Sequence, residues 1–98
     1  MASGIKDKVA IIGMGCTRFG ELWDKSADDL IIDASYEACE DAGVDLKDIE
    51  AAWLGTVFSG HTAVSLSAPL SWQYKPVTRV ENMCATGTEA LRAAAYAV

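Results

Sequence analysis

The chain has 98 residues, a length that suits one small domain or part of a larger one. Lys and Arg total 8 against 14 Asp and Glu, so the net charge is −6. That charge argues against a nucleic-acid or anionic-membrane binder, because either would need a basic surface. No apolar run reaches about 18 residues, so no transmembrane helix is expected. Three cysteines, an odd and low number, argue against a disulfide framework and favour a cytoplasmic setting.

The first half of the sequence predicts a strand, a loop and a helix. Residues 8–14 form a short, continuously apolar run, which is typical of a strand buried on both faces. Residues 15–25 have the glycines and mixed polar residues of a loop. Ser26 is suited to cap a helix over residues 26–42, whose apolar residues repeat at helical spacing and which Gly43 follows.

The second half predicts two further strands, each followed by helical sequence. Residues 51–58 are an apolar stretch typical of a strand, and residues 59–76 form a long connection that suits a short helix. A third short strand is predicted at residues 76–80. From Cys84 to Val98 the sequence is rich in alanine and carries little charge, which predicts a helix buried on most sides. The order βαβαβα indicates an α/β fold with a mainly parallel sheet.

Residues 1–98 contain no linker, repeat or low-complexity tract, so a single segment without an internal domain boundary is expected. The last helix reaches Val98 without a stop signal. A three-stranded sheet with one apolar helix would also leave an edge and a helix face uncovered. The sequence therefore predicts an incomplete domain, either part of a longer chain or a piece that needs a partner chain.

Two nucleotide-binding motifs are absent from the sequence. Gly13 and Gly15 follow the first predicted strand, but the dinucleotide fingerprint needs a third glycine where Arg18 stands. It also needs the helix to open at once, whereas the predicted helix begins near Ser26. A tight exit from the strand explains the two glycines. No Gly-Lys-Ser/Thr sequence occurs, so a P-loop is excluded as well.

The candidate metal ligands are widely spaced, so no metal site is predicted. They are Cys16, Cys39, Cys84 and the single His61, and none forms a closely spaced pair with another. Cys39 falls among the apolar residues of the predicted first helix, as expected of a small packed hydrophobe. Cys16 and His61 fall in predicted loops, where a structural cysteine and a surface histidine are the expected roles.

Cys84 stands where a short strand turns into an apolar helix. Backbone N–H groups and the helix dipole stabilise a thiolate at such a position. The same N–H groups can face a developing oxyanion. Gly87, one turn further on, leaves room for a substrate or a neighbouring helix. This layout is the cysteine counterpart of a nucleophile elbow, and by itself it leaves open whether Cys84 is catalytic or only packed.

The segment from Val80 to Leu91 has the sequence Val-Glu-Asn-Met-Cys-Ala-Thr-Gly-Thr-Glu-Ala-Leu. It resembles the nucleophile segment of the thiolase superfamily, in the branch of sterol-carrier-protein-type thiolases and acetyl-CoA acetyltransferase-like proteins. In that branch an Asn-rich turn precedes a Cys-Ala/Ser-Thr-Gly run that opens a buried helix. Looser likenesses occur at residues 9–20, 33–43 and 53–57, so the resemblance covers nearly the whole chain.

The resemblance implies that Cys84 accepts an acyl group from a thioester, with its backbone N–H in the oxyanion hole. The acyl group would then pass to CoA, or to an acyl-CoA carbanion, so that a 3-ketoacyl-CoA is cleaved or formed. CoA and acyl-CoA would be substrates, with no covalently bound cofactor. The resemblance further implies a role in lipid metabolism, a homodimer or tetramer with residues 59–76 at the interface, and in some members a small zinc-ribbon and OB-fold partner protein.

The family also needs an activating His, a His-containing oxyanion motif and a second Cys, and none of these is found within residues 1–98. His61 falls in no such motif. Glu81 stands where the family commonly has Asn, and an inward carboxylate there would disfavour a thiolate at Cys84. The sequence therefore predicts the N-terminal part of a thiolase-like acyltransferase that is inactive by itself. Two alternatives stay open: a non-catalytic thiolase-like subunit that needs a partner chain, and a ketoacyl-synthase-like condensing enzyme.

Overall fold

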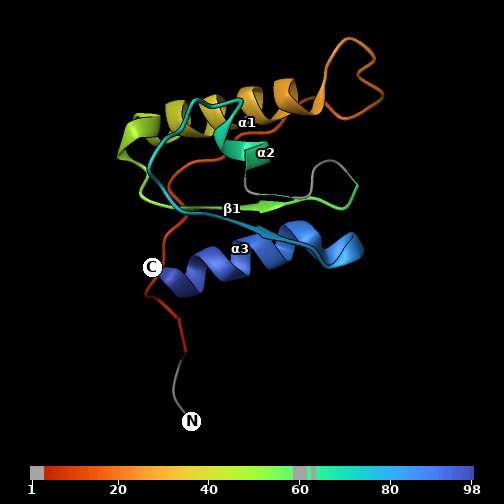
Figure 1. Cartoon of the computed structure of the whole chain (residues 1–98). Coiled ribbons are helices and arrows are strands. Elements are labelled where there is room, and N and C mark those ends of the chain that lie inside the picture. Colours follow the sequence, from red (N-terminus) through yellow and green to blue (C-terminus); the bar gives the residue numbers. More distant parts are fainter. Residues whose placement is uncertain (1–3, 59–61, 63) are drawn as a thin grey trace.

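A computed structural model describes residues 4–58, 62 and 64–98, and it has a three-layer α/β arrangement. Two short parallel strands pair with Ala52 opposite Val77 and Gly55 opposite Val80. The first two helices lie on one face of this sheet and the third lies on the other (Figure 1). The expected fold class is therefore confirmed. The elements in chain order are α1 (Ala27–Ala42), β1 (Ala52–Gly55), α2 (Val64–Ser67), β2 (Val77–Val80) and α3 (Thr86–Ala97), with 3₁₀ turns at Leu46–Asp48 and Met83–Ala85.

The strand predicted at residues 8–14 is not part of the described sheet, which contains β1 and β2. These residues form an irregular segment beside α1, where the Met14 N–H donates to Asp41 Oδ2 at 3.0 Å. Ile11 and Ile12 are 67% and 66% exposed instead of buried on both faces. The prediction of a buried strand was wrong because a strand needs a hydrogen-bonded neighbour, and an apolar run reports only the tendency to be buried.

The two glycines of this segment serve a different purpose from a tight strand exit. A Cβ at Gly13 would lie 2.5 Å from the Ala38 carbonyl oxygen. A Cβ at Gly15 would lie 2.1 Å from the Ala34 carbonyl oxygen and 2.7 Å from the Ala38 nitrogen. No real side chain is accommodated at such distances, so both glycines allow the backbone to lie directly on α1. Small residues on both sides thus hold the segment and the helix together.

Helix α1 has the predicted bounds, and its ends are capped by hydrogen bonds. Asp29 N–H donates to Ser26 Oγ at 3.2 Å, and Ser26 N–H donates to Asp29 Oδ2 at 2.9 Å, which completes a capping box. At the other end Gly43 adopts a left-handed conformation with φ of 73°. The Val44 N–H donates to the Cys39 carbonyl oxygen at 3.1 Å, as in a Schellman motif. These signals lie close together in the sequence, which explains why the helix could be predicted.

The buried core comes from the long connection between the strands. Leu66, Leu70 and Trp72 are its buried hydrophobic residues, and Trp72 donates from Nε1 to the Leu46 carbonyl oxygen at 3.3 Å. Leu66 lies in α2, which confirms the short helix expected within residues 59–76. Partly buried residues from α1, the first 3₁₀ turn and its end, and both strands pack around this cluster: Ile31, Ile32, Leu46, Ile49, Ala52, Leu54 and Val77. The connection therefore joins α1 to the sheet.

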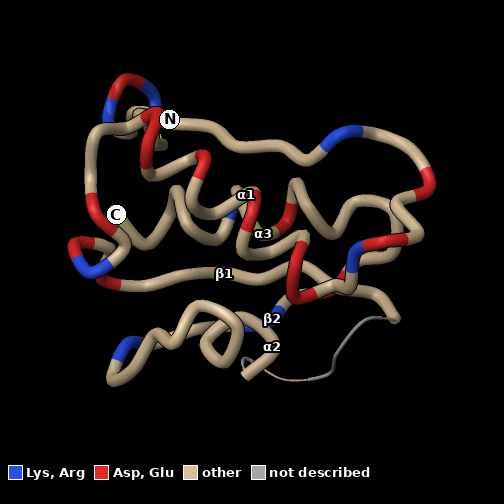
Figure 2. The backbone as a smooth tube through the Cα atoms, turned by 90° about the horizontal axis from the view of Figure 1, so that it is seen from above, with Lys and Arg blue, Asp and Glu red and all other residues tan. Residues whose placement is uncertain are grey.

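The expectation that the last helix is buried on most sides was wrong for the described structure. In α3 the buried residue is Thr86, whereas Leu91 and Tyr96 are 55% and 60% exposed. The helix covers one face of a two-stranded sheet, which is too narrow to bury more than one side of it. Charged residues gather along α1 and in the turns, while most of α2 and α3 is uncharged (Figure 2). Among the described residues no helix is both long and apolar enough to cross a membrane.

Gly15→Ala is expected to destabilise the fold by about 1–3 kcal/mol, the usual range for overpacking. The new methyl group would meet backbone atoms of α1, so the helix or the segment beside it must shift. Gly87→Ala is the matched control, because a Cβ there meets no atom within 4 Å. Urea denaturation followed by circular dichroism measures both variants. An unchanged unfolding midpoint for Gly15→Ala would contradict the close contact.

The capping box predicts a specific loss of stability in acid. The Ser26 backbone N–H, followed by its hydroxyl, holds the pKa of Asp29 below its usual value of 3.8. A carboxyl whose pKa is lower in the folded state stabilises that state above its unfolded pKa, and this contribution is lost as the pH falls through the folded pKa. As the pH is lowered below about 4, the thermal unfolding midpoint of the wild type should therefore decrease more steeply than that of Asp29→Asn. Asp28→Asn, which removes a carboxylate with no hydrogen bond to Ser26, should keep the wild-type slope.

Candidate active site at the Cys84 turn

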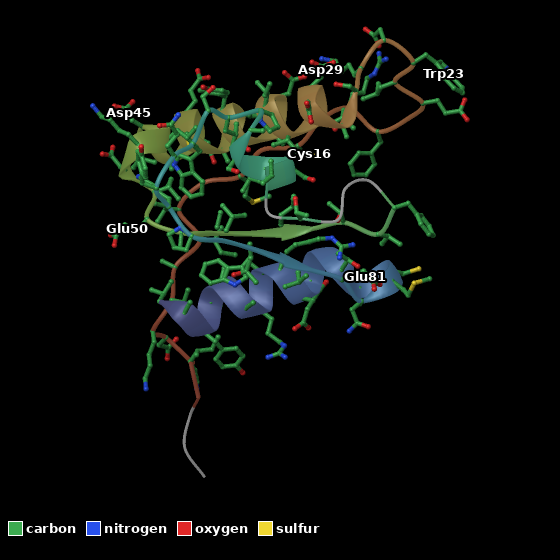
Figure 3. All side chains as sticks on the ribbon, in the orientation of Figure 1. Cys16, Trp23, Asp29, Asp45, Glu50 and Glu81 are labelled. Atoms are coloured by element: carbon green, nitrogen blue, oxygen red, sulfur yellow. The ribbon has the colours of Figure 1, made fainter. Side chains whose placement is uncertain are left out.

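Cys84 lies in the 3₁₀ turn Met83–Ala85, which joins the carboxyl end of β2 to the start of α3. The turn stands at the end of the sheet to which both strands point (Figure 1). Glu81 marks its beginning in Figure 3, well away from the chain termini. The thiol is free and exposed. Within the part of the chain that the structure describes, no hydrogen bond to this side chain is present. The sequence prediction of a strand, a cysteine and a helix in direct succession is therefore confirmed.

One threonine side chain closes the turn. Thr86 Oγ1 accepts from the Asn82 backbone N–H at 2.9 Å and donates to the Met83 carbonyl oxygen at 2.6 Å. The Ala85 N–H adds a turn bond to the Asn82 carbonyl oxygen at 2.9 Å. Thr86 is 6% exposed, so its hydroxyl is shielded from water, whereas its partners Asn82 and Met83 are exposed. The backbone on the N-terminal side of Cys84 is thus held by the residue two positions after it.

The residue immediately before Cys84 has an unusual backbone conformation. Met83 has φ of 48°, in the left-handed region that a non-glycine residue rarely adopts. The Met83 backbone N–H donates a hydrogen bond to the carboxylate of Glu81, two residues earlier. The Glu81 side chain is therefore engaged in the turn and is exposed (Figure 3). The exposed Cys84 thiol thus stands directly after the strained residue of a sharp strand-to-helix turn, a layout similar to that of a nucleophile elbow.

The end of β1 supports the turn from the neighbouring strand. A Cβ at Gly55 would lie 2.6 Å from Thr86 Cγ2 and 3.1 Å from its carbonyl oxygen, so the strand and the helix start are in direct contact. Arg79, on β2, donates from Nε to Thr56 Oγ1 at 2.7 Å and from Nη2 to the Thr56 carbonyl oxygen at 3.0 Å. The Thr56 N–H donates to the Val80 carbonyl oxygen at 3.4 Å. Both strand ends are therefore fixed beside the turn.

The other residues considered from the sequence do not join this site. Cys39 is half-buried and lines an apolar cavity of about 290 Å³, as expected of a packed hydrophobe. Cys16 is exposed, and its thiol donates to the Thr17 carbonyl oxygen at 3.2 Å. His61 lies outside the described residues. Across the described ranges, no group of three His, Cys, Asp or Glu side chains is placed to hold a metal ion.

Three residues in contact around the Cys84 turn, Gly55, Arg79 and Thr86, were not singled out from the sequence. Thr86 was noted only as part of the motif, although a threonine at a helix start commonly bonds to nearby backbone groups. Arg79 was considered only as part of the short strand predicted at residues 76–80, where it stands between Thr78 and Val80. Gly55 carried no local signal. Its role depends on a contact with Thr86, 31 residues away in the chain.

The sequence of this chain is similar to those of several known proteins. No family model matches the sequence. The chain is 44% identical over 92 residues to an acetyl-CoA acetyltransferase of Methanocaldococcus jannaschii. This match covers 88% of the chain and 24% of the relative. It is 41% identical over 96 residues to an acetyl-CoA acetyltransferase of Methanothermobacter thermautotrophicus, covering 92% and 25%. It is 32% identical over 94 residues to sterol carrier protein 2 of Gallus gallus, covering 92% and 17%.

The chain thus spans about a quarter or less of the length of the curated relatives it matches. The fold and the Cys84 turn define an α/β protein with a cysteine at a strand-to-helix elbow. The relatives bear the two names, acetyl-CoA acetyltransferase and sterol carrier protein 2, that the motif from Val80 to Leu91 predicted. The resemblance to this branch of the thiolase superfamily is therefore confirmed, and the chain belongs to this family.

Removal of the Arg79 side chain should loosen the strand ends beside the turn. Arg79→Ala is expected to cost about 1.5–3 kcal/mol of stability, because hydrogen bonds from a half-buried charged group are lost. Arg92→Ala is the control: this exposed residue pairs with Glu89 at 3.3 Å on the surface of α3, and its loss should cost below about 1 kcal/mol. Chemical denaturation compares the two variants. Equal losses would show that the bonds to Thr56 contribute nothing specific.

Proposed function

We propose that this chain supplies the nucleophile of a thiolase-type acyl-CoA acyltransferase, with Cys84 as the acyl-accepting residue. The observation that carries the proposal is the exposed Cys84 thiol at a strained turn before α3, within a motif resembling that of thiolases. Two relatives at 44% and 41% identity bear the name acetyl-CoA acetyltransferase, which supports an acyl-CoA thioester as the substrate class.

In the proposed reaction the Cys84 thiolate attacks the carbonyl carbon of an acyl-CoA. A new C–S bond forms, and the carbonyl oxygen becomes an oxyanion that the Cys84 backbone N–H stabilises. Collapse of this intermediate breaks the C–S bond to CoA, whose thiolate leaves and takes up a proton. The acyl-enzyme formed in this way splits the overall transfer into two steps.

In the second step the acyl group leaves Cys84. When a carbanion of a second acyl-CoA attacks the acyl carbon, a C–C bond forms and the product is a 3-ketoacyl-CoA. In the opposite direction the thiolate attacks the 3-keto carbon of that compound, the C–C bond breaks, and the departing acyl-CoA carbanion takes up a proton. Ping-pong kinetics follow from the covalent intermediate. The family resemblance implies that the base that activates Cys84 belongs to His and Cys motifs, and these are not found in residues 1–98. The same proposal includes a homodimer or tetramer in the cytoplasm.

Intact-protein mass spectrometry after incubation with acetyl-CoA tests the nucleophile. Two samples are compared, the chain of residues 1–98 and a longer natural form that contains these residues. The longer form should gain about 42 Da, because one acetyl group replaces the thiol hydrogen. Peptide mapping should place the group on Cys84. Cys84→Ala should abolish the adduct and reduce acetyl transfer by orders of magnitude.

Cys16→Ala and Cys39→Ala are the matched controls, since one removes an exposed thiol and the other a half-buried thiol. Both should keep the adduct on Cys84. Wild-type thiolysis by the longer form with Cys84→Ala would refute the assigned role. The absence of any adduct in both forms would instead favour a non-catalytic thiolase-like subunit, with Cys84 retained as part of the fold.

A further inference from the structure

Thr86 has properties that the nucleophile motif alone does not explain. It is the buried polar residue among those that the structure describes, at 6% exposure. Its hydroxyl has one hydrogen to donate, and that hydrogen is directed to the Met83 carbonyl oxygen, while the same oxygen accepts from the Asn82 N–H. Both bonds go to the backbone immediately before Cys84. The side chain is therefore fully engaged in fixing the turn.

We propose that Thr86 is a positioning residue, which holds Cys84 in the orientation needed for acyl transfer. This inference rests on the proposed function of Cys84. Met83, directly before Cys84, has a left-handed backbone at φ of 48°, which sets the direction in which the chain enters Cys84. Such a conformation costs energy for a side-chain-bearing residue, so it persists only where surrounding bonds determine it. The two bonds of Thr86 Oγ1 flank this residue.

The methyl group of Thr86 makes a second contribution. It meets the sheet at Gly55, where an added Cβ would lie 2.6 Å from Cγ2. The position of the turn relative to β1 is therefore set by the same side chain that sets the turn conformation. Serine would keep the hydroxyl and the backbone contact with Gly55, and would lose only the contact of the methyl group. Valine would keep the contact and lose both hydrogen bonds, so the two substitutions separate the roles.

The test measures the rate of Cys84 acetylation by acetyl-CoA in a single turnover, using the longer natural form. Thr86→Val should lower this rate by about 10- to 100-fold, because a small displacement of a nucleophile has that effect. The acetyl-CoA concentration at half-saturation should stay at the wild-type value, since the substitution changes positioning and not binding. Thr86→Ser should stay within about threefold of wild type, because it restores the hydroxyl.

Thr88→Val is the matched control, because Thr88 lies in the same helix and is exposed. It should leave the rate unchanged. Wild-type acetylation by Thr86→Val would overturn the proposal. Should Thr86→Val fail to fold by circular dichroism, Thr86→Ser decides: retention of the rate in this folded variant would show that the hydroxyl is sufficient without the methyl group and would support the proposal, whereas a large loss would show that the two hydrogen bonds alone do not position Cys84 and would overturn it.

A second probe separates this inference from the proposed function. Iodoacetamide alkylates exposed thiols without any enzyme activity, and Cys16 serves as the internal standard. Thr86→Val should lower the ratio of Cys84 to Cys16 alkylation, and Thr86→Ser should preserve it. A normal ratio in Thr86→Val would overturn the positioning role. The wild type could fail to accept an acetyl group while the ratio of Cys84 to Cys16 alkylation is still reduced in Thr86→Val. That result would refute the proposed function and leave the positioning of Cys84 supported.

Discussion

Close backbone contact at glycine is the constraint on which this structure depends. Gly55 brings β1 against the first residue of α3, and Gly13 and Gly15 bring the N-terminal segment against α1. A composition in which sixteen of 98 residues are alanine suits such packing, because small side chains let elements approach where larger ones would separate them. Bulky core residues are correspondingly few, and Leu66, Leu70 and Trp72 form one cluster on the α1 side of the sheet.

The contact at Gly55 connects the fold to the site. Parallel strands present their carboxyl ends at one edge, and in this chain both ends are joined there by Arg79, Thr56 and the Val80 carbonyl oxygen. The chain leaves β2 and turns within a few residues into α3. Cys84 is carried on that turn. Its placement therefore follows from sheet geometry together with one buried threonine, and the thiol itself contributes nothing to the packing.

The parts that sequence could predict are those whose determinants lie near one another in the chain. Helix α1 was predicted with its correct ends because Ser26, Asp29 and Gly43 act within a few residues of the helix. The strand at residues 8–14 was predicted wrongly, because its pairing depends on a neighbour that an apolar run does not specify. The core at Leu66, Leu70 and Trp72 was missed, because it falls in a stretch of mixed composition with no clear periodicity.

The same distinction applies to the candidate site. Cys84 could be singled out from its local layout and its family resemblance, whereas Thr86 and Arg79 gain their roles from contacts across the fold. The bonds described around the turn join residues 79–86 to one another and to Thr56, which directly follows β1. The contacts described around the turn therefore come from residues 55–86. Within the described residues, the conformation that presents the Cys84 thiol therefore depends on the glycine, the threonine and the two strand ends.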